Sequence, residues 1–516
     1  MFRHIGSNWT LVILRMAVMI VLTPLMQHDE HGVGGSAYGV FLGIISLLGF
    51  IDLLALGVPM ATVKHVAEGV ATGDVERTNR AFSTSLGITL GMGAMALVVS
   101  LALYLPFVHG LDQLIDKDAN LLGIFPDARL TFAIVAVHGS LAFAMRLPYA
   151  LFDAHHEFTA KNLIAAAGLV LRVVLVIGLL AWRPTIVMLG VTVAACTLFE
   201  FVACLVVIRR KHPEIRPSLA SFDRASARGI FNFSVFATLV SVGSMLAFRL
   251  DAVVIGATLT AQDVTAYGNG SVFFEPLIAL MIGIGAVVMP TATKLAAQGK
   301  KAELVPIVER WMRIGFSLQL LVCGYLIAFG PEFLGRWIAP EYEQSAGPLT
   351  QVLAASFIFF LPVRAVGLSA LLGLGQARKP AIGLVVMGVA NLLISIALAK
   401  PLGVFGVALG TAIPNVVYAA WLVRELCKEL EIPMGRTLVE LFARIPLGIL
   451  PPVILAFALK GYVDSSSWFR ILGAGVLWSV VFGLAWGFYV YRGDPHLDLG
   501  ATVSRLRARF AGRNGS

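Results

Sequence analysis

The sequence is poor in charged residues. Asp, Glu, Lys and Arg make up 13% of the chain, whereas a soluble domain is nearer one quarter charged, so water cannot be the main solvent of the folded protein. Long polar segments are missing too: the widest gaps between apolar runs are about twenty residues, which excludes a separate soluble domain. The chain is instead 58% hydrophobic, with a mean hydropathy of +0.85.

Cysteine and nucleotide motifs are equally scarce. The four cysteines, Cys196, Cys204, Cys323 and Cys427, suggest neither a disulfide framework nor a metal site. No Walker sequence is present, so ATP is not expected to bind. The segments between the apolar runs are too short to carry the catalytic groups of an enzyme such as a membrane glycan ligase or polymerase. We therefore expect no enzyme activity, no catalytic residue, no cofactor and no metal.

Apolar runs of membrane-spanning length fill the chain. A span needs about 20 such residues. The runs cover residues 8–26, 38–60, 82–107, 130–151, 162–181, 185–208, 229–257, 265–290, 312–330, 349–373, 381–399, 402–423, 442–460 and 469–491. No small-residue cleavage site follows the first run, so we interpret it as a retained helix. The sequence predicts an all-α polytopic membrane protein with about fourteen transmembrane helices.

The basic residues alternate between the two sides of this map. With the N-terminus inside, 26 of the 39 Lys and Arg fall in cytoplasmic segments and seven on the opposite side. Such a bias is the positive-inside signal, and it predicts that both termini are cytoplasmic. It also explains the net charge of +9 without nucleic acid, which we do not expect as a partner.

The chain repeats itself at a shift of roughly 220 residues, the length of about six helices. Tyr38-Gly39 corresponds to Tyr267-Gly268, Pro59 to Pro290, and Leu147-Pro148 to Leu361-Pro362. An even number of spans preserves orientation, so the halves are predicted to be parallel repeats, as in transporters that bind substrate between two rocking halves. We predict a six-helix lobe at 1–218, a second at 219–432, and two extra helices with a basic tail at 433–516.

Short motifs point to a known superfamily. The stretch from Ile51 to Gly57, followed by Val66-Ala67-Glu68-Gly69, resembles the second-helix signature of the polysaccharide (Wzx-like) flippase branch of the multidrug/oligosaccharidyl-lipid/polysaccharide exporter superfamily. The stretch from Arg249 to Gly256 is similar to its seventh-helix signature, and Gly373 to Ala377 resembles its loop between spans ten and eleven.

The resemblance implies a MATE-like fold in the bacterial inner membrane. It further implies transport of a polyprenyl-diphosphate-linked oligosaccharide to the outer leaflet by alternating access, for surface polysaccharide biosynthesis. The partners would be that glycan lipid, membrane lipid and other polysaccharide assembly proteins. From the resemblance alone, the last two spans are expected to offer the lipid tail a groove.

Arginines inside apolar spans are the candidate substrate site. They are Arg15, Arg146, Arg172, Arg249 and Arg364. A charge at the bilayer centre costs about 2.5–3.5 kcal/mol on insertion scales, so each should face a cavity, which we expect between the halves. The guanidinium fork matches phosphate oxygens, and this favours the pyrophosphate of a lipid carrier as the ligand.

Acidic residues in the spans are fewer. Asp52, Asp251 and Glu275 are candidates either for coupling an ion or for structural pairing, and Arg15 is one possible partner of Asp52. The driving force is left open among a proton gradient, a sodium gradient and the membrane potential. Two other functions also stay open: a lipid II flippase of peptidoglycan synthesis, and a multidrug/cation antiporter of the same superfamily.

Overall fold

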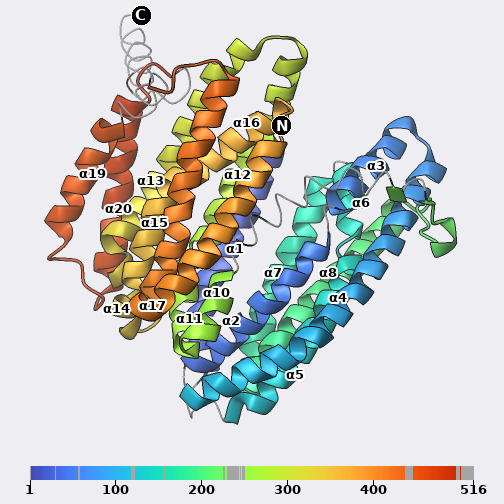
Figure 1. Ribbon diagram of the computed structural model, residues 1–516, viewed down its shortest axis with the longest axis horizontal. Helices are drawn as coiled ribbons and strands as arrows, with labels where there is room; N and C mark the ends of the chain where they lie inside the picture. Colours follow the sequence, from blue (N-terminus) through green and yellow to red (C-terminus); the bar gives the residue numbers. More distant parts are fainter. Residues whose placement is uncertain are drawn as a thin grey trace, which may run out of the picture. The chain divides into compact units, whose positions relative to one another are not determined.

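The computed structural model describes residues 2–28, 31–55, 58–117, 123–155, 157–224, 227–228, 243, 246, 250–435, 445–494 and 500. Every regular element among them is helical, and Figure 1 follows the helices from α1 to α20. The chain divides into two compact units. The first unit is Met1–Pro276 with Ala381–Pro414, and the second unit is Leu277–Pro380 with Asn415–Ser516. The lobe boundaries at 218 and 432 rest on the sequence repeat and stay a prediction.

The first unit contains the helices up to α11. They are α1 (Phe2–Gln27), α2 (Gly35–Gly49), η1 (Phe50–Ala55), α3 (Val58–Thr72), α4 (Val75–Lys117), α5 (Phe125–Met145), α6 (Pro148–Ala154), α7 (Phe158–Trp182), α8 (Ile186–Lys211), η3 (Leu219–Ser221), α10 (Leu250–Thr258) and α11 (Ala261–Ser271). Local signals start two of them. The Asp74 carboxylate accepts the Arg77 backbone N–H at 2.9 Å before α4, and Thr260 and Asp263 form a capping box at α11.

The second unit contains most of the later helices. They are η4 (Lys301–Glu303), α13 (Leu304–Trp337), α14 (Glu341–Ser345), α15 (Gly347–Val363), η5 (Arg364–Leu368), α16 (Ser369–Gly373), α19 (Ile445–Leu459), α20 (Trp468–Ala485) and η6 (Trp486–Val490). Two long helices, α12 (Phe274–Ala297) and α17 (Arg378–Glu429), contribute residues to both units.

The long element α17 is a helical hairpin. Gly403 interrupts it at φ 60° and ψ −145°, a backbone conformation that favours glycine. Asn391 and Thr411 are 20 residues apart and hydrogen-bond at 3.1 Å, whereas one straight helix would separate them by about 30 Å. The chain therefore reverses near Gly403, between the predicted spans 381–399 and 402–423.

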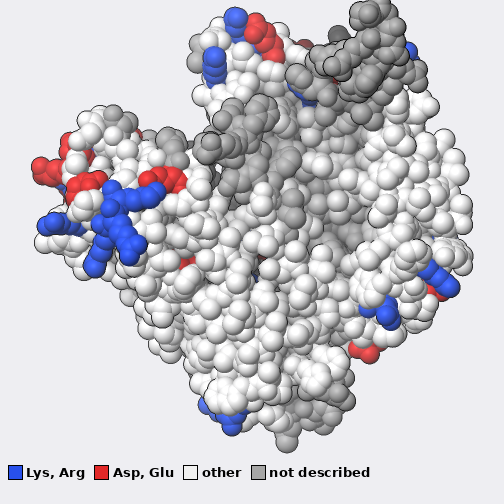
Figure 2. Space-filling model, turned by 180° about the vertical axis from the view of Figure 1, so that it is seen from behind, with Lys and Arg blue, Asp and Glu red and all other residues white. Residues whose placement is uncertain are grey.

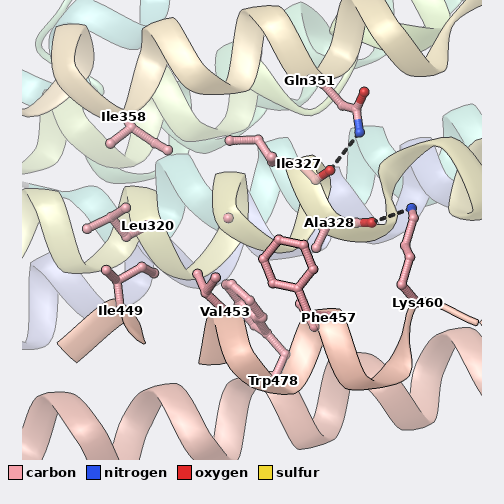
Figure 3. Close-up of a pocket in the computed structure, with 12 residues that line it drawn as sticks. Leu320, Ile327, Ala328, Gln351, Ile358, Ile449, Val453, Phe457, Lys460 and Trp478 are labelled. Carbon is pink, nitrogen blue, oxygen red and sulfur yellow. Dashed lines mark hydrogen bonds between the residues drawn. The ribbon is translucent and has the colours of Figure 1, made fainter. Parts of the chain in front are cut away.

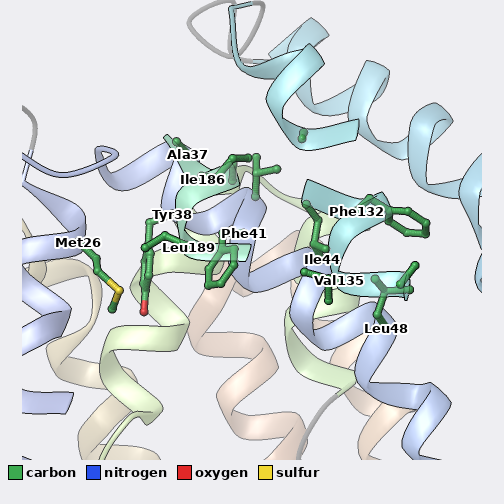
Figure 4. Close-up of a cluster of buried hydrophobic side chains, with 14 of the residues drawn as sticks. Met26, Ala37, Tyr38, Phe41, Ile44, Leu48, Phe132, Val135, Ile186 and Leu189 are labelled. Atoms are coloured by element: carbon green, nitrogen blue, oxygen red, sulfur yellow. The ribbon is translucent and has the colours of Figure 1, made fainter. Parts of the chain in front are cut away.

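The core of the first unit lies where α2, α5 and α8 meet (Figure 4). Buried residues of α2 recur at helical spacing, at Ala37, Phe41, Ile44 and Leu48, so one face of α2 turns inward. Close packing of α2 extends to α11, because a methyl group on Gly39 would lie 2.0 Å from the Ala261 carbonyl oxygen. Small residues at such positions let membrane helices approach each other.

The helices have the length and composition of membrane spans. Among the described residues, ten helices are long and apolar enough to cross a bilayer. Thirteen of the fourteen predicted runs have a helix at their position, and the run at 229–257 lies mostly outside the described residues. These observations confirm the all-α, polytopic membrane fold.

The outer surface is largely apolar. On the face in Figure 2, charged side chains of the described residues form a few small groups with wide uncharged areas between them. Large hydrophobic side chains are exposed, for example Phe457 at 79% and Phe469 at 82%. A surface of this kind is suited to lipid rather than to water.

Candidate functional site

The structure describes four of the five candidate arginines. Arg15 on α1 and Arg172 on α7 are exposed side chains, and α1 packs against α7. Arg146 ends α5 as its C-cap residue. These three arginines belong to the first unit, whereas Arg364 belongs to the second, and Arg249 lies outside the described residues.

Asp52 has a different cationic neighbour from the one considered in the sequence. Its Oδ1 lies 3.7 Å from a guanidinium nitrogen of Arg146, and both side chains are about half exposed. Arg15 is not the partner, because the 3₁₀ turn η1 carries Asp52 toward the end of α5 instead. The pair lies within electrostatic reach of His138, whose Nε2 hydrogen-bonds Thr197 Oγ1 at 2.9 Å.

Arg172 lies on α7 of the same unit. It lies within electrostatic reach of Tyr38 on α2 and of Cys196 on α8. Within the part of the chain that the structure describes, no carboxylate lies within ion-pair distance of Arg15 or Arg172.

Arg364 stands at a local irregularity of the second unit. It is half-buried and begins η5, a five-residue π-helix between α15 and α16. Single π turns inside α-helices are rare and occur frequently at functional sites. Arg364 also lies close enough to Tyr418 for the two side chains to interact electrostatically.

Asp251 is the most deeply embedded of the candidate carboxylates. It is 2% exposed, and its Oδ2 accepts hydrogen bonds from the Tyr267 hydroxyl and, at 2.8 Å, from Thr411 Oγ1. Its Oδ1 is buried with no hydrogen-bond partner among the described residues. Asn391 Nδ2 donates to Thr411 at 3.1 Å, and Ser395 Oγ donates to Asn391 Oδ1 at 3.1 Å.

The hairpin of α17 assembles this oxygen-rich cluster. Asn391 and Ser395 are one turn apart on its first arm, and Thr411 comes from its second arm. Sequence reasoning identified Asp251 but missed these three residues and Tyr267 as site residues. The spacing of Asn391 and Ser395, four residues apart in an apolar run, was the signal that would have placed them on one helix face.

The remaining acidic candidate is less enclosed. Glu275 is exposed in the first turn of α12, a favourable place for a carboxylate next to the positive end of the helix dipole. Its proposed roles, like that of Asp52, stay predictions.

The second unit contains an apolar cavity of about 460 Å³ between α13, α15, α19 and α20 (Figure 3). Leu320, Ile358, Val453 and Phe457 are among its lining residues, with Trp478 at one side. Its polar residues are few. Gln351 donates to the Ile327 carbonyl at 2.7 Å, and Lys460 is bound to the Ala328 carbonyl at 2.9 Å and to Glu332 at 2.6 Å.

The sequence matches the family described as "Lipid II flippase MurJ" over residues 72–469, which is more than half of the chain. The chain belongs to this family. The membership, with the structural likeness described below, confirms the predicted superfamily of membrane flippases with a MATE-like fold. The narrower polysaccharide branch stays a prediction.

A curated relative carries a glycan-related name. The "Probable low-salt glycan biosynthesis flippase Agl15" of Haloferax volcanii is 21% identical over 278 residues, which is 54% of this chain. The matched part spans 56% of that relative's length.

Solved structures share the fold. The lipid II flippase MurJ in an inward closed conformation aligns with 95% of this chain and 99% of its own, at a TM-score of 0.68 and 12% identity. The inward-facing conformation of a multidrug resistance MATE family transporter aligns with 82% of this chain and 95% of its own, at a TM-score of 0.60 and 16% identity. At these identities the likeness concerns the fold alone.

Proposed function

We propose that the chain moves a polyprenyl-diphosphate-linked oligosaccharide from the cytoplasmic to the outer leaflet of the bacterial inner membrane, for surface polysaccharide biosynthesis. The observation that carries this proposal is the presence of Arg15 and Arg172 on neighbouring apolar helices without carboxylate partners among the described residues. Cations at this depth are costly unless an anion visits them. A pyrophosphate supplies that anion, and arginine binds it bidentately.

Glycan display in cells that lack their own flippase tests the proposal. An Arg15→Ala, Arg172→Ala double substitution should abolish display at an unchanged protein level. A protein with Arg172→Lys should support less display than the wild type but more than the alanine variant, because the point charge of lysine cannot make the bidentate contact. Arg183→Ala is the matched control, since Arg183 caps the far end of the same helix α7. Full display from the double variant would contradict the proposed site.

The family membership favours a second candidate substrate, lipid II. The two candidates share the diphosphate lipid carrier and differ in the glycan. Cells depleted of their lipid II flippase separate the two: rescue of growth supports lipid II, whereas restored glycan display without rescue supports the surface polysaccharide.

An inward-moving cation is proposed to bind at Asp251. The buried Oδ1 without a partner and the oxygens of Asn391 and Thr411 suit a proton or a sodium ion. Asp251→Asn should make transport in vesicles insensitive to an imposed proton or sodium gradient. A variant that keeps the full gradient response would exclude this role for Asp251.

The lipid tail is proposed to use the apolar cavity of the second unit. The cavity lies against α19 and α20, the two helices without a counterpart in the repeat, and its lining is mainly aliphatic and aromatic. Val453→Trp should fill it and weaken binding of long-chain carriers while a short-chain diphosphate still binds. Equal loss for both chain lengths would point to a general folding defect.

Alternating access with both termini in the cytoplasm completes the proposal, on the basis of the parallel repeat and the distribution of basic residues. In a variant without the native cysteines, a cysteine at Glu341 should react with an impermeant reagent from outside. A cysteine at Ser218 should not. Labelling of the Ser218 position from outside would overturn this orientation.

A further inference from the structure

Glu200 is a further carboxylate inside an apolar helix of the first unit, besides Asp52 and Asp251. Glu200 lies on α8, eleven residues before the helix ends at Lys211, so it lies about 16 Å from that end. Its Oε2 accepts a hydrogen bond from the Tyr149 hydroxyl at 2.8 Å. Its Oε1 lies on the backbone of α7, because a methyl group on Gly168 would come within 2.4 Å of it.

The packing of α7 on α8 brings Glu200 toward Arg172. The two helices are joined by a three-residue connection and run antiparallel, with Gly168 against Glu200. Arg172 is one turn beyond Gly168, and Cys196 is one turn before Glu200. Arg172 and Glu200 both lie within electrostatic reach of the Cys196 thiol. Helical side chains lean toward the N-terminus of their own helix, so Arg172 and Glu200 lean toward each other.

The other nearby cation is already neutralised. Lys161 also acts electrostatically in this region, on Cys204, but its ammonium lies 2.6 Å from the Asp153 carboxylate. Arg172 has no carboxylate within ion-pair distance among the described residues, and Glu200 is held by Tyr149 instead. Arg172 and Glu200 therefore lie about one helix turn apart along the packed helices α7 and α8.

We infer that Glu200 is the exchangeable counter-charge of Arg172: it moves from the Tyr149 hydroxyl, where this structure places it, to neutralise Arg172 in the return step, and the substrate's anionic headgroup keeps it on Tyr149. This inference rests on the proposed function, because it assumes that an anion binds Arg172. The exchange keeps a bare arginine from facing lipid during the return step. It also makes release of the headgroup easier, because Glu200 competes for Arg172. Glu200 is thus a positioning residue that acts through Arg172.

Glu200→Gln tests the inference directly. The amide keeps the size of the side chain and still accepts the Tyr149 hydrogen bond, so the fold should persist, which thermal unfolding in detergent checks. Binding of farnesyl diphosphate to the purified full-length protein should tighten roughly tenfold, as expected when one opposing unit charge is removed about a helix turn away. Turnover of a fluorescent polyprenyl-diphosphate glycan in vesicles should fall, because release slows.

Tyr149→Phe should act in the opposite direction. Without the hydroxyl, Glu200 loses the group that holds it away from Arg172, so farnesyl diphosphate should bind more weakly. Glu157→Gln is the matched control, because Glu157 pairs with Lys211 at 3.1 Å near the ends of the same two helices. It should leave binding unchanged.

The Arg172→Ala background separates counter-charge from general electrostatics. There, Glu200→Gln should no longer tighten binding. A persistent effect, an unchanged affinity in the wild-type background, or a Tyr149→Phe variant that binds more tightly would each overturn the inference. If instead the wild-type protein neither bound farnesyl diphosphate nor moved any diphosphate lipid, the proposed function itself would fail.

Discussion

The hydrogen bond from Thr411 to Asp251 reports whether Asp251 is ionised, because its energy depends on the charge of the carboxylate. The Thr411 hydroxyl donates to the buried carboxylate at 2.8 Å, and its oxygen accepts from Asn391 at 3.1 Å. Thr411→Val keeps nearly the same shape and removes both interactions. Thr411 is 2% exposed, so water cannot replace the lost hydroxyl. The substitution therefore isolates the polar contribution.

The size of the loss depends on the protonation of Asp251. A hydrogen bond to a charged group contributes about 1.5–3 kcal/mol to stability, and a neutral one about 0.5–1.5 kcal/mol. We expect Thr411→Val to lower the free energy of unfolding by about 2–3 kcal/mol where Asp251 is ionised, and by about 1 kcal/mol where it is protonated or replaced by asparagine.

Denaturant unfolding of the purified protein in detergent, with Thr411→Val measured alone and with Asp251→Asn, gives both values. The two single changes should not be additive, because the residues are in contact. A loss below about 0.5 kcal/mol in both backgrounds, less than one neutral hydrogen bond is worth, would show that the contact carries no energy. An equal loss of any size in both backgrounds would show that Asp251 is not ionised under the conditions used.

Three further predictions concern the stability contributed by a helix contact, an ion pair and a hydrogen bond. Gly39→Ala should destabilise the protein by about 1–3 kcal/mol, because the α2–α11 contact has no room for a methyl group, whereas Gly43→Ala, which has open space, should leave the unfolding temperature unchanged. Lys460→Met should destabilise by leaving the nearly buried Glu332 unpaired, and adding Glu332→Gln should recover part of the loss; no recovery would contradict the pairing. Trp478→Phe should cost about 1 kcal/mol through loss of its 2.8 Å bond to a carbonyl of α13, and an unchanged midpoint in the same unfolding assay would refute that.

The membrane-spanning helices were predictable because a bilayer requires apolar runs of a set length. Their full extent was not. The run at 82–107 became α4, which spans Val75–Lys117, because Asp74 caps its start and polar residues of its first turns bind the loop that follows α8. Asn79, for example, accepts the Arg216 backbone N–H at 2.7 Å. Such extensions depend on contacts between distant segments, which hydropathy does not report.

The candidate site was predictable only in its charged members. Charges in apolar runs are conspicuous, so Asp251 and the arginines were identified directly. Tyr267, Asn391 and Thr411 carry no charge and are inexpensive to place in a helix interior. Their role depends on the reversal of α17 at Gly403, which brings together residues separated by up to 160 positions. Arg146 was not predicted as the partner of Asp52 for a related reason: the direction of the Asp52 side chain is set by the η1 turn, which the sequence pattern does not reveal.

The proposed substrate headgroup is an anion that moves outward, and the proposed coupling ion is a cation that moves inward. The membrane potential therefore acts on both movements. With the cell interior negative, moving an anionic headgroup outward is favourable by about 2.3 kcal/mol per charge for each 100 mV. A cation that enters at the Asp251 cluster gains the same amount for each charge, so the two movements are driven by the potential in the same sense. A counter-charge that returns with Arg172 reduces the positive charge that the empty protein carries back, and with it the electrical cost of the return step. Potential-dependence should therefore concentrate in the loaded step, and vesicles clamped at zero potential should show slower export with little change in headgroup affinity.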